Sequence, residues 1–172
     1  RAMLNGAASG CKSQVDITLI NHSVHPPRFL KQLSVRYYFS IAELQARGDS
    51  IADVTASVIY DNGLDHAEPT RLRGPVACPS DPSLYYYELG HQGYQFWGAL
   101  PQLRAPRRTI LELGVAYGPG CTWEGENDFS HVGLVQAQQR SPQVPAYDGA
   151  TRVWGDAPPC GDEPPPPDSP LE

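Results

Sequence analysis

Two glutamates of this sequence could carry hydrolytic chemistry. Glu88 and Glu112 each lie within a strand-like pattern, and two carboxylates about 5–10 Å apart across a cleft are what a glycosidase needs. Solvent-facing glutamates on alternating strands arise easily in β proteins, so this pair alone is weak support for catalysis. No serine lies in a G-x-S-x-G setting and the five histidines form no H-E-x-x-H unit, so a triad or zinc hydrolase has no support.

The acidic loop at residues 123–128 is the second group with chemical potential. It combines carboxylates, backbone carbonyl groups and a glycine within six residues, a composition that suits a hard cation such as Ca²⁺. The 12-residue spacing of an EF-hand is absent, and a solvated acidic loop is the competing interpretation. The loop is therefore a candidate cation site.

Aromatic side chains form the third group, because sugar rings stack their C–H groups on aromatic faces while polar neighbours bind the hydroxyls. Alternation along strands sends about half of such side chains into the core. Only some of these residues can therefore be ligands: Tyr37, Tyr38, Tyr85, Tyr86, Tyr87, Tyr94, Phe96 and Trp97.

Short strands must position these residues. Residues 33–41 alternate strictly between apolar and more polar side chains, which predicts a half-buried strand. Residues 43–47 fit one helical turn, residues 64–83 a polar loop, and residues 147–154 a hairpin around Asp148 and Gly149. Further strands are predicted at residues 15–20, 54–60, 84–89, 109–117 and 131–135.

Composition points to an all-β protein. Of 172 residues, 18 are proline and 16 are glycine, which break helices and suit turns. The net charge of −6 offers no basic stripe for nucleic acid, and no apolar run is long enough for a membrane span. We expect a fragment of a longer chain, with a flexible leader at residues 1–13, one domain at 14–158 and a proline-rich linker at 159–172.

The four cysteines predict two disulfides and an oxidising compartment, because none forms a C-x-x-C pair. Three pairings are possible. We favour Cys11–Cys160, which would tie the first strand to the end of the last, together with Cys78–Cys121. Buried free thiols are the alternative.

Several blocks of sequence, in order, resemble family 3 carbohydrate-binding modules. The stretch at residues 25–29 (His-Pro-Pro-Arg-Phe) precedes residues 33–40 (Leu-Ser-Val-Arg-Tyr-Tyr-Phe-Ser), as in that family. The match runs from about residue 12 to 158, and ordered blocks at the family's spacing are more specific than any single motif. The other blocks are residues 48–53, 84–89, 123–130, 144–149 and 153–155.

The resemblance implies a nine-stranded antiparallel β-sandwich with jelly-roll topology, no catalytic residues and one structural Ca²⁺. Ala42 stands where many members have a carboxylate, so Glu43 substitutes for it or the site is weakened. The resemblance assigns the calcium ligands to Ser40, Glu43, Glu124, Asn127 and Asp128, with Ser40, Glu124 and Asn127 offering backbone carbonyls.

The resemblance also bears on the ligand. Gly114 and Gly120 stand where members that grip crystalline cellulose carry an arginine and a tryptophan, so the resemblance implies that the flat binding strip is largely missing. That pattern is similar to the subfamily attached to family 9 glycoside hydrolases, whose modules guide a single glucan chain. A shallower groove on the opposite sheet would use Arg36, Tyr38, Tyr85 and Tyr87.

The function implied is that of a secreted, extracellular module of a cellulase. Its partners would be cellulose or a single β-1,4-glucan chain, and a catalytic glycoside hydrolase domain in the same polypeptide, with neither nucleic acid nor membrane involved. Two alternatives stay open: a small jelly-roll glycosidase that uses Glu88 and Glu112, and a protein docking module for a catalytic domain.

Overall fold

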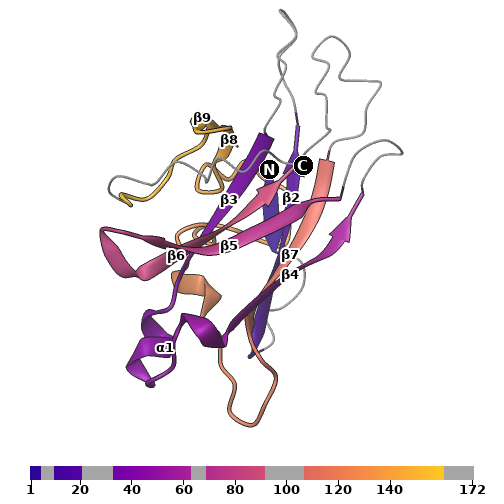
Figure 1. Cartoon of the computed structure of the whole chain (residues 1–172). Coiled ribbons are helices and arrows are strands. Elements are labelled where there is room, and N and C mark those ends of the chain that lie inside the picture. The colour runs from indigo at the N-terminus through magenta and orange to yellow at the C-terminus, as the bar shows by residue number, and fades with distance from the viewer. Residues whose placement is uncertain (5–9, 21–32, 63–68, 92–106, 161–172) are drawn as a thin grey trace, which may run out of the picture.

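The computed structural model describes residues 1–4, 10–20, 33–62, 69–91 and 107–160, and these form a sandwich of two antiparallel sheets (Figure 1). The predicted all-β sandwich is therefore confirmed. Nine strands lie within the described residues: β1 (Ala2–Leu4), β2 (Lys12–Leu19), β3 (Leu33–Ser40), β4 (Val54–Asp61), β5 (Arg71–Cys78), β6 (Asp81–Gly90), β7 (Arg107–Val115), β8 (Ala146–Asp148) and β9 (Thr151–Trp154).

The nine strands are divided between two sheets, and each sheet has one outer face. Sheet A has the order β1-β2-β7-β4, and sheet B has the order β5-β6-β3-β8-β9. In the described connections there are three short helices: α1 (Ala42–Ala46), η1 (Ile51–Asp53) and η2 (Gly125–Asn127). The helical turn predicted at residues 43–47 corresponds to α1.

The core between the sheets follows from period-two alternation. Val35, Tyr37 and Phe39 of β3 point inward beside Tyr87 of β6, and their rings and methyl groups are almost completely buried. Each such buried apolar side chain contributes about 1.5–3 kcal/mol relative to an exposed one. The inward residues of sheet A are Val15, Ile17, Leu111, Leu113 and Val115.

Three local predictions were wrong. Ala2–Leu4, placed in the flexible leader, form β1 against β2, and Arg71–Cys78, placed in a polar loop, form β5. β5 contains Pro75, which an edge strand tolerates because one of its sides needs no ladder hydrogen bonds. Residues 131–135 form turns rather than a strand, with Leu134 buried and its apolar neighbours Val132 and Val135 exposed.

Two disulfides form, as predicted, but the favoured pairing was wrong. Cys11 is bonded to Cys121, and Cys78 is bonded to Cys160. The first pair follows from sheet pairing, because β2 and β7 run side by side with Lys12 opposite Gly114. The chain that leaves β7 therefore returns beside Cys11, where Trp123 N donates to Gly10 O at 2.6 Å.

No helix in the described part of the chain is both long enough and apolar enough to cross a membrane. Of the predicted proline-rich linker, only Pro159 and Cys160 lie among the described residues.

Candidate functional site

A β-bulge in β4 turns a tyrosine onto the outer face of sheet A. Alternation from Val54 through Val58 would send Tyr60 into the core. The register with β7 instead shifts between Val58, which lies opposite Leu111, and Tyr60, which lies opposite Ile110. Tyr60 is consequently 44% exposed. The amino-acid pattern gives no sign of this bulge, so sequence reasoning did not select Tyr60 as a site residue.

Tyr60 belongs to a row of three side chains that crosses three neighbouring strands. Arg108 of β7 donates to Oδ2 of Asp16 of β2, from Nε at 2.8 Å and Nη2 at 2.6 Å. The Cζ of Arg108 lies 5.2 Å from the centroid of the Tyr60 ring. The ion pair fixes the guanidinium and the guanidinium packs on the ring, so the row presents one planar cation beside one aromatic face.

A second, more polar row lies further along the same face. Glu112 of β7 accepts from Nζ of Lys12 at 2.6 Å and from Nε2 of Gln14 at 2.9 Å. These hydrogen bonds, with that from Lys12 the larger, lower the pKa of Glu112 below its usual value and keep it ionised. The exposed Ser57 lies opposite Glu112 on β4. The face therefore offers donors and acceptors next to an aromatic ring, a combination that suits a polyol surface.

Gly114 sits on this face where two backbones approach closely. A Cβ atom there would collide with the carbonyl oxygen of Cys11 and lie 2.7 Å from Cα of Lys12. Only glycine fits such an approach without a backbone shift. The close pairing of β2 and β7 thus requires glycine at position 114, where the resemblance predicted the loss of a strip arginine.

The outer face of sheet B also carries an arginine among tyrosines, but all of them are buried. Arg36 of β3 pairs with Glu88 of β6, with Nε 3.0 Å from Oε2. The Cζ of Arg36 lies 4.7 Å from the ring centroid of Tyr86 and 4.0 Å from that of Tyr147. Tyr38, on the same face, has its hydroxyl 3.2 Å from that of Tyr147.

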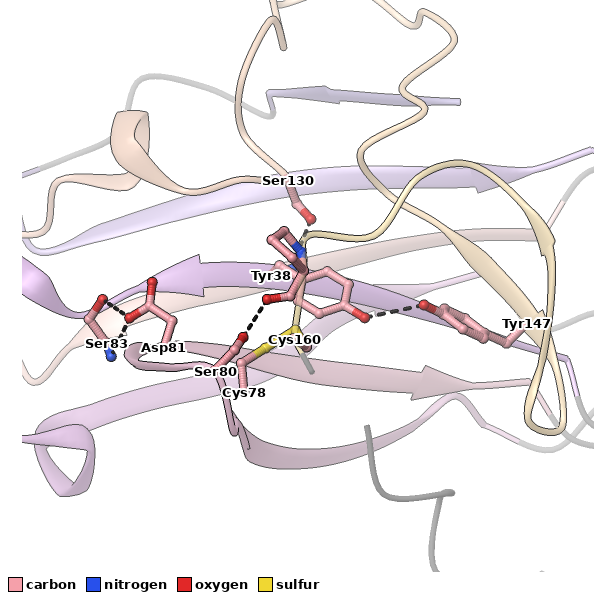
Figure 2. Close-up of a disulfide and its surroundings, with 9 residues drawn as sticks. Tyr38, Cys78, Ser80, Asp81, Ser83, Ser130, Tyr147 and Cys160 are labelled. Carbon is pink, nitrogen blue, oxygen red and sulfur yellow. Dashed lines mark hydrogen bonds between the residues drawn. A yellow bond between two sulfur atoms is a disulfide. The ribbon is translucent and has the colours of Figure 1, made fainter. Parts of the chain in front are cut away.

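Residues 155–160, here named the C-terminal strap, cover part of this face. The strap leaves β9 at one edge of sheet B and ends at Cys160, whose disulfide reaches Cys78 of β5 at the other edge. Ser80 holds it with two hydrogen bonds, from its hydroxyl to Pro159 O and from its N to Cys160 O. Figure 2 shows this disulfide beside Tyr38. Tyr38 and Tyr86 pack with the two cysteines and Ala157 in a small separate core.

The four residues predicted for a shallow groove are therefore not brought together. Arg36 and Tyr38 lie on the outer face of sheet B, but both are fully buried. Tyr85 and Tyr87 point the opposite way, into the main core, where both rings stack with Phe39. The reason is register: Tyr86 lies opposite Tyr38, and Glu88 lies opposite Arg36, so the residues between them alternate inward.

The glutamate pair considered for glycoside hydrolysis is split between the two sheets. Glu88 lies on the outer face of sheet B with Arg36, and Glu112 lies on the outer face of sheet A with Lys12. The whole core separates these faces, so the two carboxylates cannot flank one glycosidic bond. The glycosidase alternative is wrong for this reason.

The acidic loop lies against the end of β3 and α1. Asp128 is completely buried, and its Oδ1 accepts from Ser40 N at 2.9 Å while its Oδ2 lies 3.4 Å from the Tyr37 hydroxyl. Burial raises the pKa of the Asp128 carboxyl well above its usual range, and the neighbouring Glu43 carboxylate raises it further, against the hydrogen bond from Ser40. The carboxylates of Asp128 and Glu43 are thus neighbours, and no arginine or lysine of the described residues forms an ion pair with either.

The donors here fit a hard cation. Glu43 accepts from Nδ2 of Asn127 at 3.1 Å through Oε2, while its Oε1 is buried and has no hydrogen-bond partner among the described residues. An unpartnered buried carboxylate oxygen beside a second buried carboxylate is what a bound Ca²⁺ would satisfy. No cluster of three or more acidic, histidine or cysteine side chains suited to a metal occurs among the described residues, so further ligands would have to be backbone carbonyls such as those predicted.

Comparison with known proteins gives consistent results for sequence and structure. The model of a family described as "Cellulose binding domain" matches residues 2–155. Endoglucanase B of Cellulomonas fimi is 31% identical over 159 residues, which are 91% of this chain and 14% of that protein. This chain spans 14–22% of the length of the curated endoglucanases it matches.

Two examples from the similar solved structures match over almost the whole chain. Endoglucanase CelQ from Clostridium thermocellum, complexed with cellotriose, superposes with a TM-score of 0.75 at 26% identity, covering 91% of this chain and 25% of that one. A family 3b carbohydrate-binding module of a scaffoldin from Bacteroides cellulosolvens superposes with a TM-score of 0.58 at 17% identity, covering 92% of this chain and 95% of that one. The second likeness is one of fold alone.

Proposed function

This chain belongs to the family of cellulose binding domains, as a non-catalytic module, and from that premise we propose that it binds β-1,4-glucan on the outer face of sheet A. The single observation that carries this assignment is the Asp16–Arg108–Tyr60 row. Among the residues that the structure describes, it is the place where an aromatic ring packs with a guanidinium on an outer face and the ring stays open to solvent. The comparable residues of sheet B, Arg36 and Tyr86, are buried.

The form of the ligand follows from the extent of this row. One exposed ring, next to hydrogen-bonding groups on Lys12, Gln14 and Glu112, can stack on one sugar and bind the hydroxyls of its neighbours. A crystal face would demand a longer flat strip, and Gly114 leaves no side chain where such a strip would continue. The favoured ligand is therefore a single glucan chain, or disordered cellulose, rather than a crystalline surface.

The module is proposed to work beside a catalytic domain in one secreted polypeptide. The curated relatives are endoglucanases, and this chain corresponds to a small part of each. Both disulfides favour an oxidising compartment. In this setting the module would hold a glucan chain for a neighbouring hydrolase. This differs from the pure docking alternative, in which the module never contacts glycan.

A structural Ca²⁺ is proposed between α1 and the acidic loop. The buried Asp128 carboxylate and the unpartnered Oε1 of Glu43 support it. Asn127, which already contacts Glu43, together with Glu124 and Ser40, would complete the set through backbone carbonyls. Bound Ca²⁺ would supply positive charge that neutralises the two carboxylates and would tie the loop to the end of β3.

The test is a depletion assay on microcrystalline cellulose, run beside affinity electrophoresis in soluble β-1,4-glucan. We expect clear retardation in the soluble glucan and weak depletion on the crystals. Tyr60→Ala and Arg108→Ala should each weaken glucan binding about tenfold, the usual cost of truncating a central aromatic or arginine contact. Tyr117→Ala is the matched control, because Tyr117 is 91% exposed and lies outside the strands of sheet A.

Each outcome separates the alternatives. If Tyr60→Ala and Arg108→Ala are retarded as strongly as the native protein, the binding surface does not lie on the outer face of sheet A. Strong depletion on microcrystalline cellulose would replace the single-chain ligand with a crystal face. No binding to either material, with helper activity retained when the module is fused to a hydrolase, would favour the docking alternative.

A further inference from the structure

Three buried polar atoms from separate parts of the chain converge on Gly125. A Cβ atom at this glycine would lie 3.1 Å from Oγ of Ser13, 3.2 Å from Nε1 of Trp123 and 3.4 Å from Nδ1 of His131. All three polar atoms are buried, and none has a hydrogen-bond partner among the described residues. Buried polar side chains are nearly always paired, so three unpaired ones around a single point require an explanation.

The chemistry of the three groups limits what can pair with them. The Trp123 indole N–H only donates, the Ser13 hydroxyl donates and accepts, and the His131 ring nitrogen does either according to tautomer. A metal cation is disfavoured, because the indole N–H would point at it. A bound anion is disfavoured as well, because Gly125 lies in the loop that carries Glu124, Glu126 and Asp128. A neutral group that both accepts and donates meets every requirement.

We propose that a single ordered water molecule is bound above Gly125 and joins Ser13, Trp123 and His131. It would accept from the indole and make one hydrogen bond to each of the other two groups, a total of three, which is the usual number for a buried water. Gly125 has no side chain, so no Cβ atom lies between the three polar atoms. The water would link β2 of sheet A to the acidic loop and to the turn after it, independently of whether the module binds glucan.

Gly125→Ala tests the proposal directly. The added methyl would occupy the space where the three polar atoms meet, and the backbone of Gly125 is not in the left-handed region, so alanine adds no conformational strain there. Gly118→Ala is the matched control, because Gly118 precedes the same loop, has no atom within 4 Å of its added Cβ, and is likewise outside the left-handed region.

The decisive measurement is transfer of magnetisation from the Trp123 indole proton to water by nuclear magnetic resonance, with a high-resolution crystal structure beside it. We expect a cross-peak of the sign given by a long-lived water in the native protein and in Gly118→Ala, and its loss in Gly125→Ala. If Gly125→Ala fails to fold, Ser13→Ala leaves the backbone unchanged and should weaken the cross-peak severalfold.

Three results would overturn the proposal. The first is the absence of a water cross-peak at Trp123 in the native protein. The second is an undiminished cross-peak in both Gly125→Ala and Ser13→Ala. The third is an anomalous peak beside Gly125 in a crystal soaked in sodium bromide, which would identify the bound species as an anion.

Discussion

Arg36 and Glu88 face each other across β3 and β6, with Nε 3.0 Å from Oε2. Both side chains are buried, and the Arg36 guanidinium packs against the rings of Tyr86 and Tyr147. A buried ion pair is costly to break, because removal of one partner leaves the other as an uncompensated charge. Arg36→Ala should therefore lower the free energy of unfolding by about 3–5 kcal/mol, measured by urea denaturation at pH 7.

Arg73→Ala is the control for this pair. Nη1 of Arg73 lies 4.0 Å from the other oxygen of the same Glu88 carboxylate, but Arg73 is partly exposed. Its removal should cost about 1 kcal/mol or less. Equal losses for the two variants would mean that burial does not set the strength of the Arg36 contact.

His91 makes stability depend on pH. Burial, reinforced by the nearby Arg107 cation and opposed by Asp61, lowers the pKa of His91 from 6.5 to about 4. Its Nδ1 lies 3.2 Å from Oγ1 of Thr70. Above pH 6.5 the imidazole is neutral in both the folded and the unfolded chain, so its full contribution to the free energy of unfolding is present. As the pH falls from about 6.5 to 4 the unfolded chain binds the proton first, and about 3 kcal/mol should be lost, at ~1.4 kcal/mol per pH unit.

Urea unfolding of the native protein and of His91→Gln between pH 4 and 7.5 checks this. The variant should lose less stability over that interval, because glutamine does not titrate. Parallel curves for the two proteins would assign the acid sensitivity to carboxylates instead.

Removal of the proposed Ca²⁺ should lower the melting temperature. A ligand bound only by the folded state stabilises it by about 2.7 kcal/mol at one hundred times its dissociation constant. Calorimetry with excess EDTA against excess CaCl₂ measures the difference. Asp128→Asn should abolish the response, whereas Glu126→Gln, a change at an exposed neighbour, should keep it. The same melting temperature in EDTA and CaCl₂ would show that Ca²⁺ does not stabilise the folded protein.

The two disulfides should differ in what their removal exposes. Cys78 and Cys160 are 82 residues apart in sequence, and their double replacement by serine should cost about 2–5 kcal/mol. It should also raise the solvent exposure of tyrosine, seen by second-derivative ultraviolet absorption, because the C-terminal strap covers Tyr38 and Tyr86. Replacement of Cys11 and Cys121 by serine should destabilise without that spectral change. The same tyrosine spectrum in both variants would mean that the strap keeps its position over Tyr38 and Tyr86 without its disulfide.

The predictable part of this fold was the part governed by alternation. Residues 33–41 and 109–117 read as strands because one face of each is apolar, and β3 and β7 lie there. β5 was missed because its edge position tolerates Gly74 and Pro75, which in sequence indicate a loop. A pattern within one strand therefore records which face is buried, but not whether the strand lies at an edge.

The candidate site was harder to predict because it depends on pairing between strands. Tyr60 reaches the surface through a register shift against β7, and Tyr85 and Tyr87 enter the core because their neighbours lie opposite Arg36 and Tyr38. The cysteine pairing has the same origin, since β2 meets β7 beside Cys11. Strand partners are long-range information that a single sequence does not display.

The C-terminal strap also determines how the module would bear mechanical load. A pull on the chain beyond Cys160 reaches the fold through a covalent bond to β5, at the far edge of sheet B from β9. Tension therefore does not load the short ladder between β8 and β9, which only hydrogen bonds hold together. A module fastened in this way can stay folded when force is applied between Cys160 and the opposite sheet.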